Sequence, residues 1–425
     1  MVNRSDKFLR VAETIGIKLC KDAIWYEDKC NWVGMVENPD ENIKQFLEHN
    51  SVQVSYEALG PTLYDGTSGI AYFLLQLYKF TNNKLFRKTA EGAIKQALYK
   101  IMLDKTLDFG FYTGSVGVAF VAYEIGKSLD DKLLLRESRD LIKKLAKRTA
   151  ITRHLDVIAG NAGAIPPLLI MYNFFNEPEI LVLAKHLGNE ILSKATREKR
   201  GISWGPECNF AYNTIHNLTG FAHGAAGMGH SLVELFKKTG ECKFLEGARN
   251  AFLYEDSWFL PKYNNWPDFR ADEYQGTQQN GELKCSMGWC HGSPGIAFTR
   301  LNAYKLVKYN ECKLYAKDAL YGIKKEIQSN IDNYSDYSLC HGIGGIADLF
   351  MYASQMLKSK KHRLFAEFLG IKGIKNYINS GSMWPCGVTG GEIPGLMVGL
   401  SGIGYFYLRL YEQKNVPSIL FITSD

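Results

Sequence analysis

The chain has 425 residues, of which 46% are hydrophobic and 22% are charged, and its formal net charge is +6. The hydrophobic share suffices for a large core, and the mild charge, with no basic cluster carrying interleaved aromatic residues, argues against nucleic-acid binding. No apolar run approaches the length of a membrane span and the first ten residues lack a signal-peptide core, so we expect a cytoplasmic protein.

The predicted elements begin with an amphipathic helix over residues 6–25, which precedes the first copy of an internal repeat. The repeat is marked by a glycine pair in the pattern G-x-x-G. Self-similarity at a period of about fifty residues is typical of repeat architectures. The first glycines of the seven pairs are Gly66, Gly114, Gly160, Gly224, Gly292, Gly342 and Gly399.

Each glycine pair is followed by a segment with helical apolar spacing, and the clearest of these segments are apolar nearly all round. Such helices suit burial on most sides. Between them lie amphipathic stretches rich in lysine and glutamate, which predict half-buried helices. The buried helices include 69–80, 117–126, 295–307 and 402–413, and the half-buried helices include 85–102, 133–147 and 314–328.

Seven buried and seven half-buried helices predict an all-α fold, an α/α toroid of seven inner and seven outer helices. The helix over 6–25 would close the outer ring against the last repeat, whereas a straight solenoid would leave apolar faces uncovered at both ends. We expect residues 1–425 to form this toroid as a single domain. The glycines fit a tight turn or a close backbone approach, but for the first, second and last pairs we interpret them only as the start of a helix.

Two repeats open with nearly the same phrase, CHGSPGIA at 290–297 and CHGIGGIA at 340–347. The nine cysteines are an odd number and are scattered along the chain, which favours free thiols and metal ligands over a disulfide framework. Cysteine and histidine are the side chains that zinc prefers. Because the two phrases occupy the same register of the repeat, stacked repeats would bring their cysteines together.

Cys290, Cys340 and one histidine make a three-ligand zinc set with an open fourth position, as catalytic zinc sites have. His341 is our choice for that histidine, and His291 is the alternative. Cys285 is a further alternative, as the fourth ligand of a structural site.

Two thiolates make zinc a weak Lewis acid toward water but suit it to holding a substrate thiol deprotonated near neutral pH. The reaction class that this favours is addition of a thiolate to an activated double bond, which requires general acid–base catalysis. His223 and Asp156 lie just before the glycine pairs of neighbouring repeats and are the candidates. The alternatives are a satisfied loop histidine at His223 and a helix N-cap at Asp156.

The segments LDVIAGNAG, FAHGAAG, MGWCHGSPGIA and LCHGIGGIA together resemble the lanthionine synthetase C (LanC-like) family of peptide cyclases. The resemblance covers nearly the whole chain. The segments at 265–270, 394–410 and 416–420 are similar in particular to the C-terminal cyclase domain of class II lanthipeptide synthetases. The resemblance implies an α/α toroid of two sevenfold helical layers, which agrees with the repeat count.

The resemblance also implies a site and a reaction. Cys290, Cys340 and His341 would bind zinc, with His223 and Asp156 as the acid–base pair. A substrate cysteine would be joined to dehydroalanine or dehydrobutyrine to give a thioether ring. The substrate would be a dehydrated precursor peptide. Because 425 residues leave no room for the N-terminal dehydratase of a class II synthetase, we expect either a free-standing cyclase that works with a separate dehydratase or a cyclase domain made or split apart from one.

Free cyclases of the family often have tyrosine after the first zinc cysteine and arginine four residues before it, where this chain has His291 and Ser286. Arg270 and Lys284 are the candidates to replace that arginine. An alternative function is a non-catalytic LanC-like protein that binds glutathione or a partner protein through the same zinc pocket. A toroidal glycoside hydrolase, which needs two carboxylates flanking a sugar site, fits the sequence less well.

Overall fold

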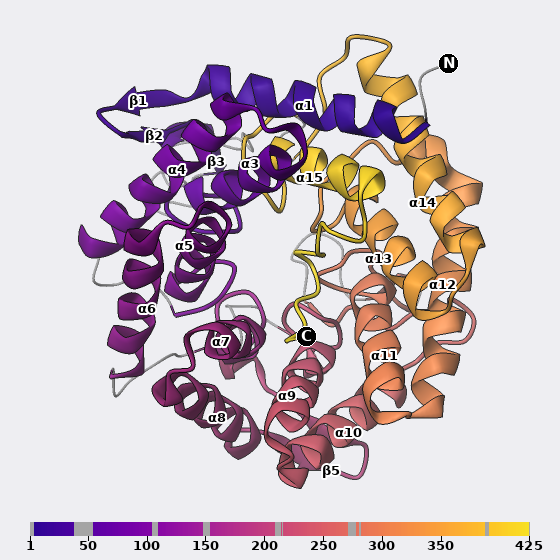
Figure 1. The fold of residues 1–425 in the computed structure, drawn as a ribbon. Helices are drawn as coiled ribbons and strands as arrows, with labels where there is room; N and C mark the ends of the chain where they lie inside the picture. The colour runs from indigo at the N-terminus through magenta and orange to yellow at the C-terminus, as the bar shows by residue number, and fades with distance from the viewer. Residues whose placement is uncertain are drawn as a thin grey trace, which may run out of the picture.

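The helices of the computed structural model are arranged in two concentric rings (Figure 1). Within the described residues, seven inner helices alternate along the chain with seven outer helices, and the prediction of an α/α toroid is confirmed. No helix in this part of the chain is both long enough and apolar enough to cross a membrane. The structure describes residues 4–37, 54–103, 109–147, 154–208, 214, 216–270, 278–279, 282–386 and 391–424.

The inner ring is closed, because each inner helix contacts the next and the last, α15 (Leu400–Tyr411), contacts the first, α3 (Thr67–Thr81). Every inner helix begins directly after the first glycine of its pair, and its first turns are buried on all sides, as the apolar sequence requires. The other inner helices are α5 (Ser115–Leu129), α7 (Asn161–Phe175), α9 (Ala225–Thr239), α11 (Ser293–Val307) and α13 (Ile343–Met356).

The outer ring consists of amphipathic helices, six of which pack against the inner helix that precedes them in the chain. The first helix, α1 (Arg4–Asp22), instead packs against α15 and so completes the outer ring, as the sequence predicted. The other outer helices are α4 (Lys84–Leu103), α6 (Lys132–Ala146), α8 (Pro178–Ser193), α10 (Cys242–Asp256), α12 (Asn310–Asn330) and α14 (Lys360–Gly373).

The helix predicted over 6–25 is wrong at its C-terminal end. α1 stops at Asp22, and the next residues form β1 (Ile24–Tyr26), which pairs with β2 (Lys29–Asn31) in an antiparallel hairpin. The turn places Glu27 at a φ of 54°, and the β-branched and aromatic residues of β1 favour a strand over a helix.

Within the described residues, three further pairs of short strands accompany the helices, and the sequence did not predict them. All are two-stranded and antiparallel. The remaining strands and short helical turns are β3 (Val33–Glu37), β4 (Val54–Ala58), β5 (Thr196–Glu198), β6 (Gly201–Ser203), β7 (Gln278–Gln279), β8 (Glu282–Leu283), η1 (Pro206–Cys208), η2 (Ile331–Asn333) and the π-helical η3 (Ile374–Ile378).

The second glycine of each pair lies where the chain passes close to itself. At Gly117 an added Cβ would lie 1.8 Å from the carbonyl oxygen of Phe111, and at Gly402 it would lie 1.9 Å from the carbonyl oxygen of Leu396. Neither distance leaves room for a side chain, so glycine is needed for the close approach. Both glycines belong to pairs that we interpreted only as helix starts, and that interpretation was therefore wrong.

Candidate functional site

The loops that precede the inner helices are joined by backbone hydrogen bonds into a closed ring. At least one N–H group in each loop donates to a carbonyl oxygen of the next loop, and the last loop donates to the first. This ring fixes the register that the sequence alignment of the repeats predicted. The bonds, as N···O distances, are Tyr64–Tyr112 2.8 Å, Tyr112–Ile158 3.1 Å, Val157–Ala222 2.9 Å, Ala222–Cys290 3.1 Å, Trp289–Cys340 2.8 Å, Cys340–Met397 2.9 Å and Met397–Tyr64 2.8 Å.

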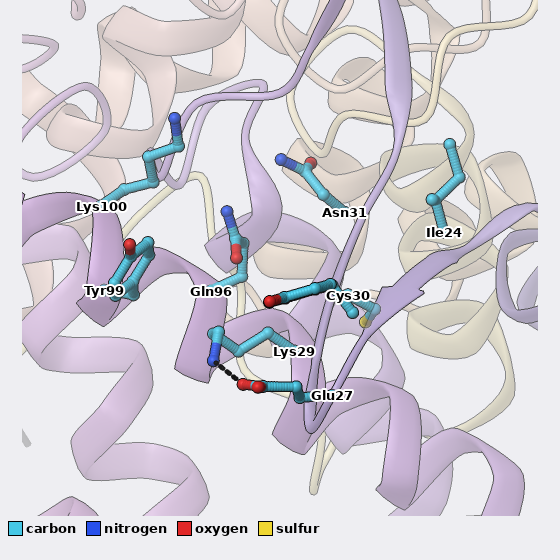
Figure 2. Close-up of a pocket in the computed structure, with 9 residues that line it drawn as sticks. Ile24, Glu27, Lys29, Cys30, Asn31, Gln96, Tyr99 and Lys100 are labelled. Carbon is cyan, nitrogen blue, oxygen red and sulfur yellow. Dashed lines mark hydrogen bonds and ion pairs between the residues drawn. The ribbon is translucent and has the colours of Figure 1, made fainter.

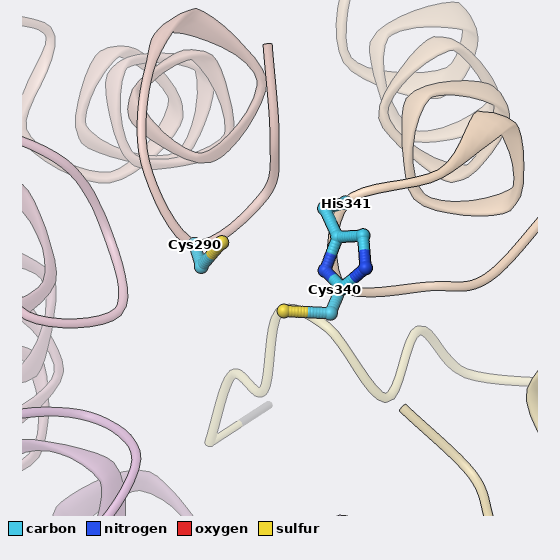
Figure 3. A group of neighbouring side chains, drawn as sticks. All are labelled: Cys290, Cys340 and His341. Carbon is cyan, nitrogen blue, oxygen red and sulfur yellow. The ribbon is translucent and has the colours of Figure 1, made fainter. Parts of the chain in front are cut away.

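Two adjacent loops of this ring bring Cys290, Cys340 and His341 together (Figure 3). One possible ligand atom from each residue lies within 4.8 Å of the other two. Cys340 is buried, whereas the His341 side chain is 45% exposed, so the group is open to solvent on the histidine side. Among the described residues, neither Cys285 nor His291 belongs to this group.

The two sulfur atoms interact directly. A hydrogen bond with Cys340 lowers the pKa of Cys290 well below its usual value, although burial opposes the shift. The same hydrogen bond, together with burial, raises the pKa of Cys340 well above its usual value. A hydrogen bond with Cys290 also raises the pKa of His341, again against burial. Cys290 is therefore the first of the two thiols to ionise.

His223 and Asp156 form a buried pair. His223 Nδ1 lies 2.7 Å from Asp156 Oδ2, and the carboxylate is fully buried. Asp156 Oδ1 also accepts the backbone N–H of Ala159 at 2.8 Å, so the carboxylate holds the turn before α7 as well. Asp156 therefore makes a contact that fits each of its two interpretations, since it caps the turn before α7 and also pairs with His223.

His291 lies between the cysteine group and this pair. Its ring stacks on that of His223, with centroids 5.4 Å apart and planes 24° apart. Burial lowers the pKa of His291 to about 4, although the charge of Cys290 opposes the shift. The His291 imidazole is therefore neutral near pH 7.

Arg270 is joined to Ser286 through the carboxylate of Asp268. Its Nη2 lies 2.6 Å from Asp268 Oδ2, and the same carboxylate accepts the Ser286 hydroxyl at 2.5 Å. Although burial opposes it, the hydrogen bond from Arg270 holds the pKa of Asp268 below its usual value. Lys284 contributes its carbonyl oxygen, which accepts the Asp268 N–H at 2.8 Å. The cationic group of Arg270 thus contacts the partner of Ser286.

Sequence reasoning gave no role to three residues that surround the cysteine group. The Tyr64 hydroxyl interacts with Cys340, Asp336 Oδ2 lies 3.4 Å from His341 Nε2, and Asp268 holds Arg270. Tyr64 carried a detectable signal, because it occupies the same register of the repeat as the two cysteines. Asp336 and Asp268 lie outside that register, so the repeat pattern did not mark them.

A pocket of 540 Å³ lies away from this site, between the β1–β2 hairpin and α4 (Figure 2). Lys29 in it pairs with Glu27 at 3.4 Å. Its lining includes none of the predicted site residues and consists of Ile24, Tyr26, Glu27, Lys29, Cys30, Asn31, Gln96, Tyr99 and Lys100.

A known family of proteins matches most of this chain. The model of the lanthionine synthetase C-like protein family matches residues 57–421, and the chain belongs to that family. The resemblance seen in the sequence is thus confirmed. The solved structure of nisin cyclase superposes with a TM-score of 0.64 at 20% identity, covers 84% of this chain and 89% of that one, and has the same fold.

Two curated relatives come from Lactococcus lactis subsp. lactis. The chain is 27% identical over 415 residues to the lacticin 481/lactococcin biosynthesis protein LcnDR2. The aligned region makes up 93% of this chain but only 39% of LcnDR2. It is 24% identical over 330 residues to the nisin biosynthesis protein NisC, covering 72% of this chain and 77% of NisC. The chain therefore spans about two fifths of the length of LcnDR2.

Proposed function

We propose that the protein is a zinc-dependent lanthipeptide cyclase. It would add cysteine thiols of a dehydrated precursor peptide to dehydroalanine or dehydrobutyrine and so form thioether rings. The proposal takes residues 1–425 to act as one cyclase domain, with a separate dehydratase supplying the peptide. The observation that carries it is the position of Cys290, Cys340 and His341 on two adjacent loops, of which the Cys290 loop lies next to the one that bears His223.

The donor set fits zinc. Two thiols and an imidazole are preferred zinc ligands, and three protein ligands leave one position for a substrate. A tetrahedral ion with bonds of about 2.3 Å to sulfur needs ligand atoms roughly 4 Å apart, and the three groups already lie within 4.8 Å of one another. With His341 Nε2 next to Asp336, Nδ1 remains to bind, and such a carboxylate partner is usual for zinc-binding histidines. When bound, the ion would lower the pKa of a substrate thiol and hold its thiolate.

The His223–Asp156 pair would handle the protons. Asp156 fixes the tautomer in which Nδ1 bears a hydrogen, so Nε2 is left to take or deliver a proton. In the balanced addition, the C–S bond forms at the β-carbon, the thiol proton leaves, and one proton is added at the α-carbon. No oxidant or reductant is required. Arg270, held by Asp268, lies within electrostatic range of His291 and His341, and its positive charge would stabilise negative charge that develops on an acceptor bound there.

Two substitutions test the assignment. Cys340→Ala should lose both zinc and ring formation, whereas His223→Ala should keep zinc and slow ring closure strongly. The assay incubates the protein with a dehydrated, cysteine-containing peptide and counts the remaining thiols by alkylation and mass spectrometry. Cys242→Ala, on the exposed surface of α10, is the matched control and should behave as the unmodified protein.

Each result separates the proposal from its alternatives. Full activity of His223→Ala would remove the acid–base role of that residue. A peptide that stays fully alkylatable, with zinc bound and the protein folded, would favour the role of a thiol-binding or partner-binding protein over that of a cyclase.

A further inference from the structure

The C-terminal segment, residues 416–424, runs into the middle of the inner helical ring (Figure 1). It has no regular secondary structure, yet most of its side chains are buried, including those of Ile419, Leu420 and Phe421. An irregular segment can be buried only if its backbone polar groups find partners. The partners of this segment therefore show what holds it in place.

Side chains from six repeats hold the backbone and the polar groups of this segment. Four of its carbonyl oxygens accept hydrogen bonds at 2.6–2.8 Å from inner-ring side chains. The residues that hold the segment therefore come from most of the ring. The partners are Tyr405 for Pro417, Asp348 for Ser418, Tyr112 for Ile419, Trp289 for Leu420, His230 for Ile422, and Glu234 and Asn173 for Ser424.

The bond to Ile422 requires a hydrogen on Nε2 of His230. His230 Nδ1 accepts from Asn302 at 3.4 Å, so Nε2 bears the hydrogen that is donated to Ile422 O at 2.8 Å. Burial lowers the pKa of His230, although the charge of Glu234 opposes the shift. Burial thus favours the neutral ring, whose Nδ1 accepts from Asn302 while Nε2–H donates to Ile422 O.

Phe421 fills the space between three inner helices. The centroid of its ring lies 4.1 Å from the ring centroid of His230 on α9, 5.2 Å from that of Phe298 on α11 and 5.4 Å from that of Tyr352 on α13. Aromatic packing of this kind adds to the apolar area that the segment buries. The segment is thus packed as tightly as a core element.

The segment also reaches the loop that carries Cys290. The indole Nε1 of Trp289 donates to Leu420 O at 2.8 Å, and the backbone N–H of Trp289 donates to Cys340 O at 2.8 Å. The Trp289 side chain is 1% exposed, with its ring 5.2 Å from that of Tyr112. One residue therefore connects the C-terminal segment to both cysteines.

We propose that residues 416–424 form a plug that closes the middle of the toroid and holds the Cys290 loop in its metal-binding geometry through the bond between Trp289 and Leu420. Trp289 is thus a positioning residue. Solvent reaches the cysteine group on the face where His341 is exposed. This inference rests on the proposed function, because the plug would make a precursor peptide enter and leave by that face and would prevent the peptide from threading through the ring.

Trp289→Phe tests the plug and keeps an aromatic side chain in contact with Tyr112. The variant loses the indole donor and should bind zinc roughly tenfold more weakly, as loss of a partner of a metal ligand does. Trp32→Phe is the matched control, because Trp32 is equally buried and its Nε1 also donates at 2.8 Å, to Leu19 O in the outer ring. Zinc affinity is measured by competition with a chromophoric chelator. Equal affinities for the two variants would overturn the proposal.

A second measurement keeps the test independent of zinc. Truncation after Ser418 removes most of the plug and should raise the alkylation rate of Cys340 in metal-free protein about tenfold or more, since Cys340 is now buried. If the truncated chain does not fold, Phe421→Leu replaces it. An unchanged alkylation rate would refute the plug. If the rate rises on truncation but the unmodified protein neither binds zinc nor closes rings, the proposed function is refuted and the plug is still supported.

Discussion

Glu255, near the end of α10, allows a prediction about stability and pH. The carboxyl group is fully buried, and its Oε1 accepts the backbone N–H groups of Gly220 at 3.0 Å and Ala226 at 2.9 Å. These two N–H groups flank the segment that carries His223. Burial raises the pKa of Glu255 from 4.5 to about 8, although the charge of Arg300 opposes the shift.

The sign of the effect follows from the two pKa values. In the unfolded chain the carboxyl ionises above pH 4.5, whereas in the folded protein it stays neutral until about pH 8. The stability that Glu255 contributes is therefore fully present below pH 4.5 and is lost as the pH rises toward 8. At about 1.4 kcal/mol per unit of pKa, the free energy of unfolding should fall by about 3 kcal/mol between pH 5 and pH 8 from this group alone.

Glu255→Gln removes the charge and keeps an acceptor for both N–H groups. We expect the variant to lack this loss of stability and to be more stable than the unmodified protein at pH 8. The measurement is the free energy of unfolding in urea at unit steps from pH 5 to pH 8. Glu255→Ala is the control, because it leaves both N–H groups without their acceptor and should lower stability at pH 5 by about 1–3 kcal/mol for each group, while it also lacks the loss of stability toward pH 8. Parallel pH profiles for Glu255→Gln and the unmodified protein would refute the reasoning.

Three further predictions concern the site and the core behind it. Asp156→Asn should slow ring closure about 10- to 100-fold at unchanged zinc content, because it removes a charge-assisted bond of about 1.5–3 kcal/mol, and an unchanged rate would exclude the pairing. Chelation should lower the melting temperature of the unmodified protein but not of Cys340→Ala, and a shift in both would point to another metal site. Arg300→Met should lower the free energy of unfolding by about 3 kcal/mol, because it removes the fully buried partner of Asp256 and leaves that carboxylate without its ion pair. A loss below about 1 kcal/mol would contradict this prediction.

The framework could be predicted from the sequence because one local signal repeats. A glycine pair before an apolar segment marks each inner helix, and the register of the pairs also predicted that Cys290 and Cys340 would lie on neighbouring loops. The amphipathic segment at the start supplied the seventh outer helix. These features depend on spacing along the chain, which a sequence states directly.

The parts that could not be predicted depend on contacts between segments with no shared pattern. Asp268 reaches the site from the irregular chain after α10, and Asp336 comes from the turn after α12. The segment VPSIL was noticed as a family resemblance, but nothing in its letters says that it enters the middle of the ring. The short hairpin after α1 was missed because an apolar run of that length suits a helix or a strand equally.

The closed ring of loops predicts that a change far from the ligands will weaken the metal site. Gly402→Ala would push against the carbonyl of Leu396, next to Met397, whose own carbonyl oxygen accepts the Cys340 N–H at 2.9 Å. Gly117→Ala makes a clash of the same size against Phe111, but in a loop that lies two steps of the ring further from Cys340. Overpacking costs about 1–3 kcal/mol at either place, so both variants should lose similar stability.

Zinc affinity should separate these two variants, with Gly402→Ala weakened several-fold more than Gly117→Ala. Chelator competition measures the affinities, and urea unfolding confirms that the stability losses match. If the two variants lose zinc equally, the loops act independently of one another, and the hydrogen-bonded ring does not transmit the position of one loop to the next. If only Gly402→Ala loses zinc, the placement of Cys340 depends on the backbone of its neighbour, and the position of the metal ligands is a property of the ring as much as of the two repeats that supply them.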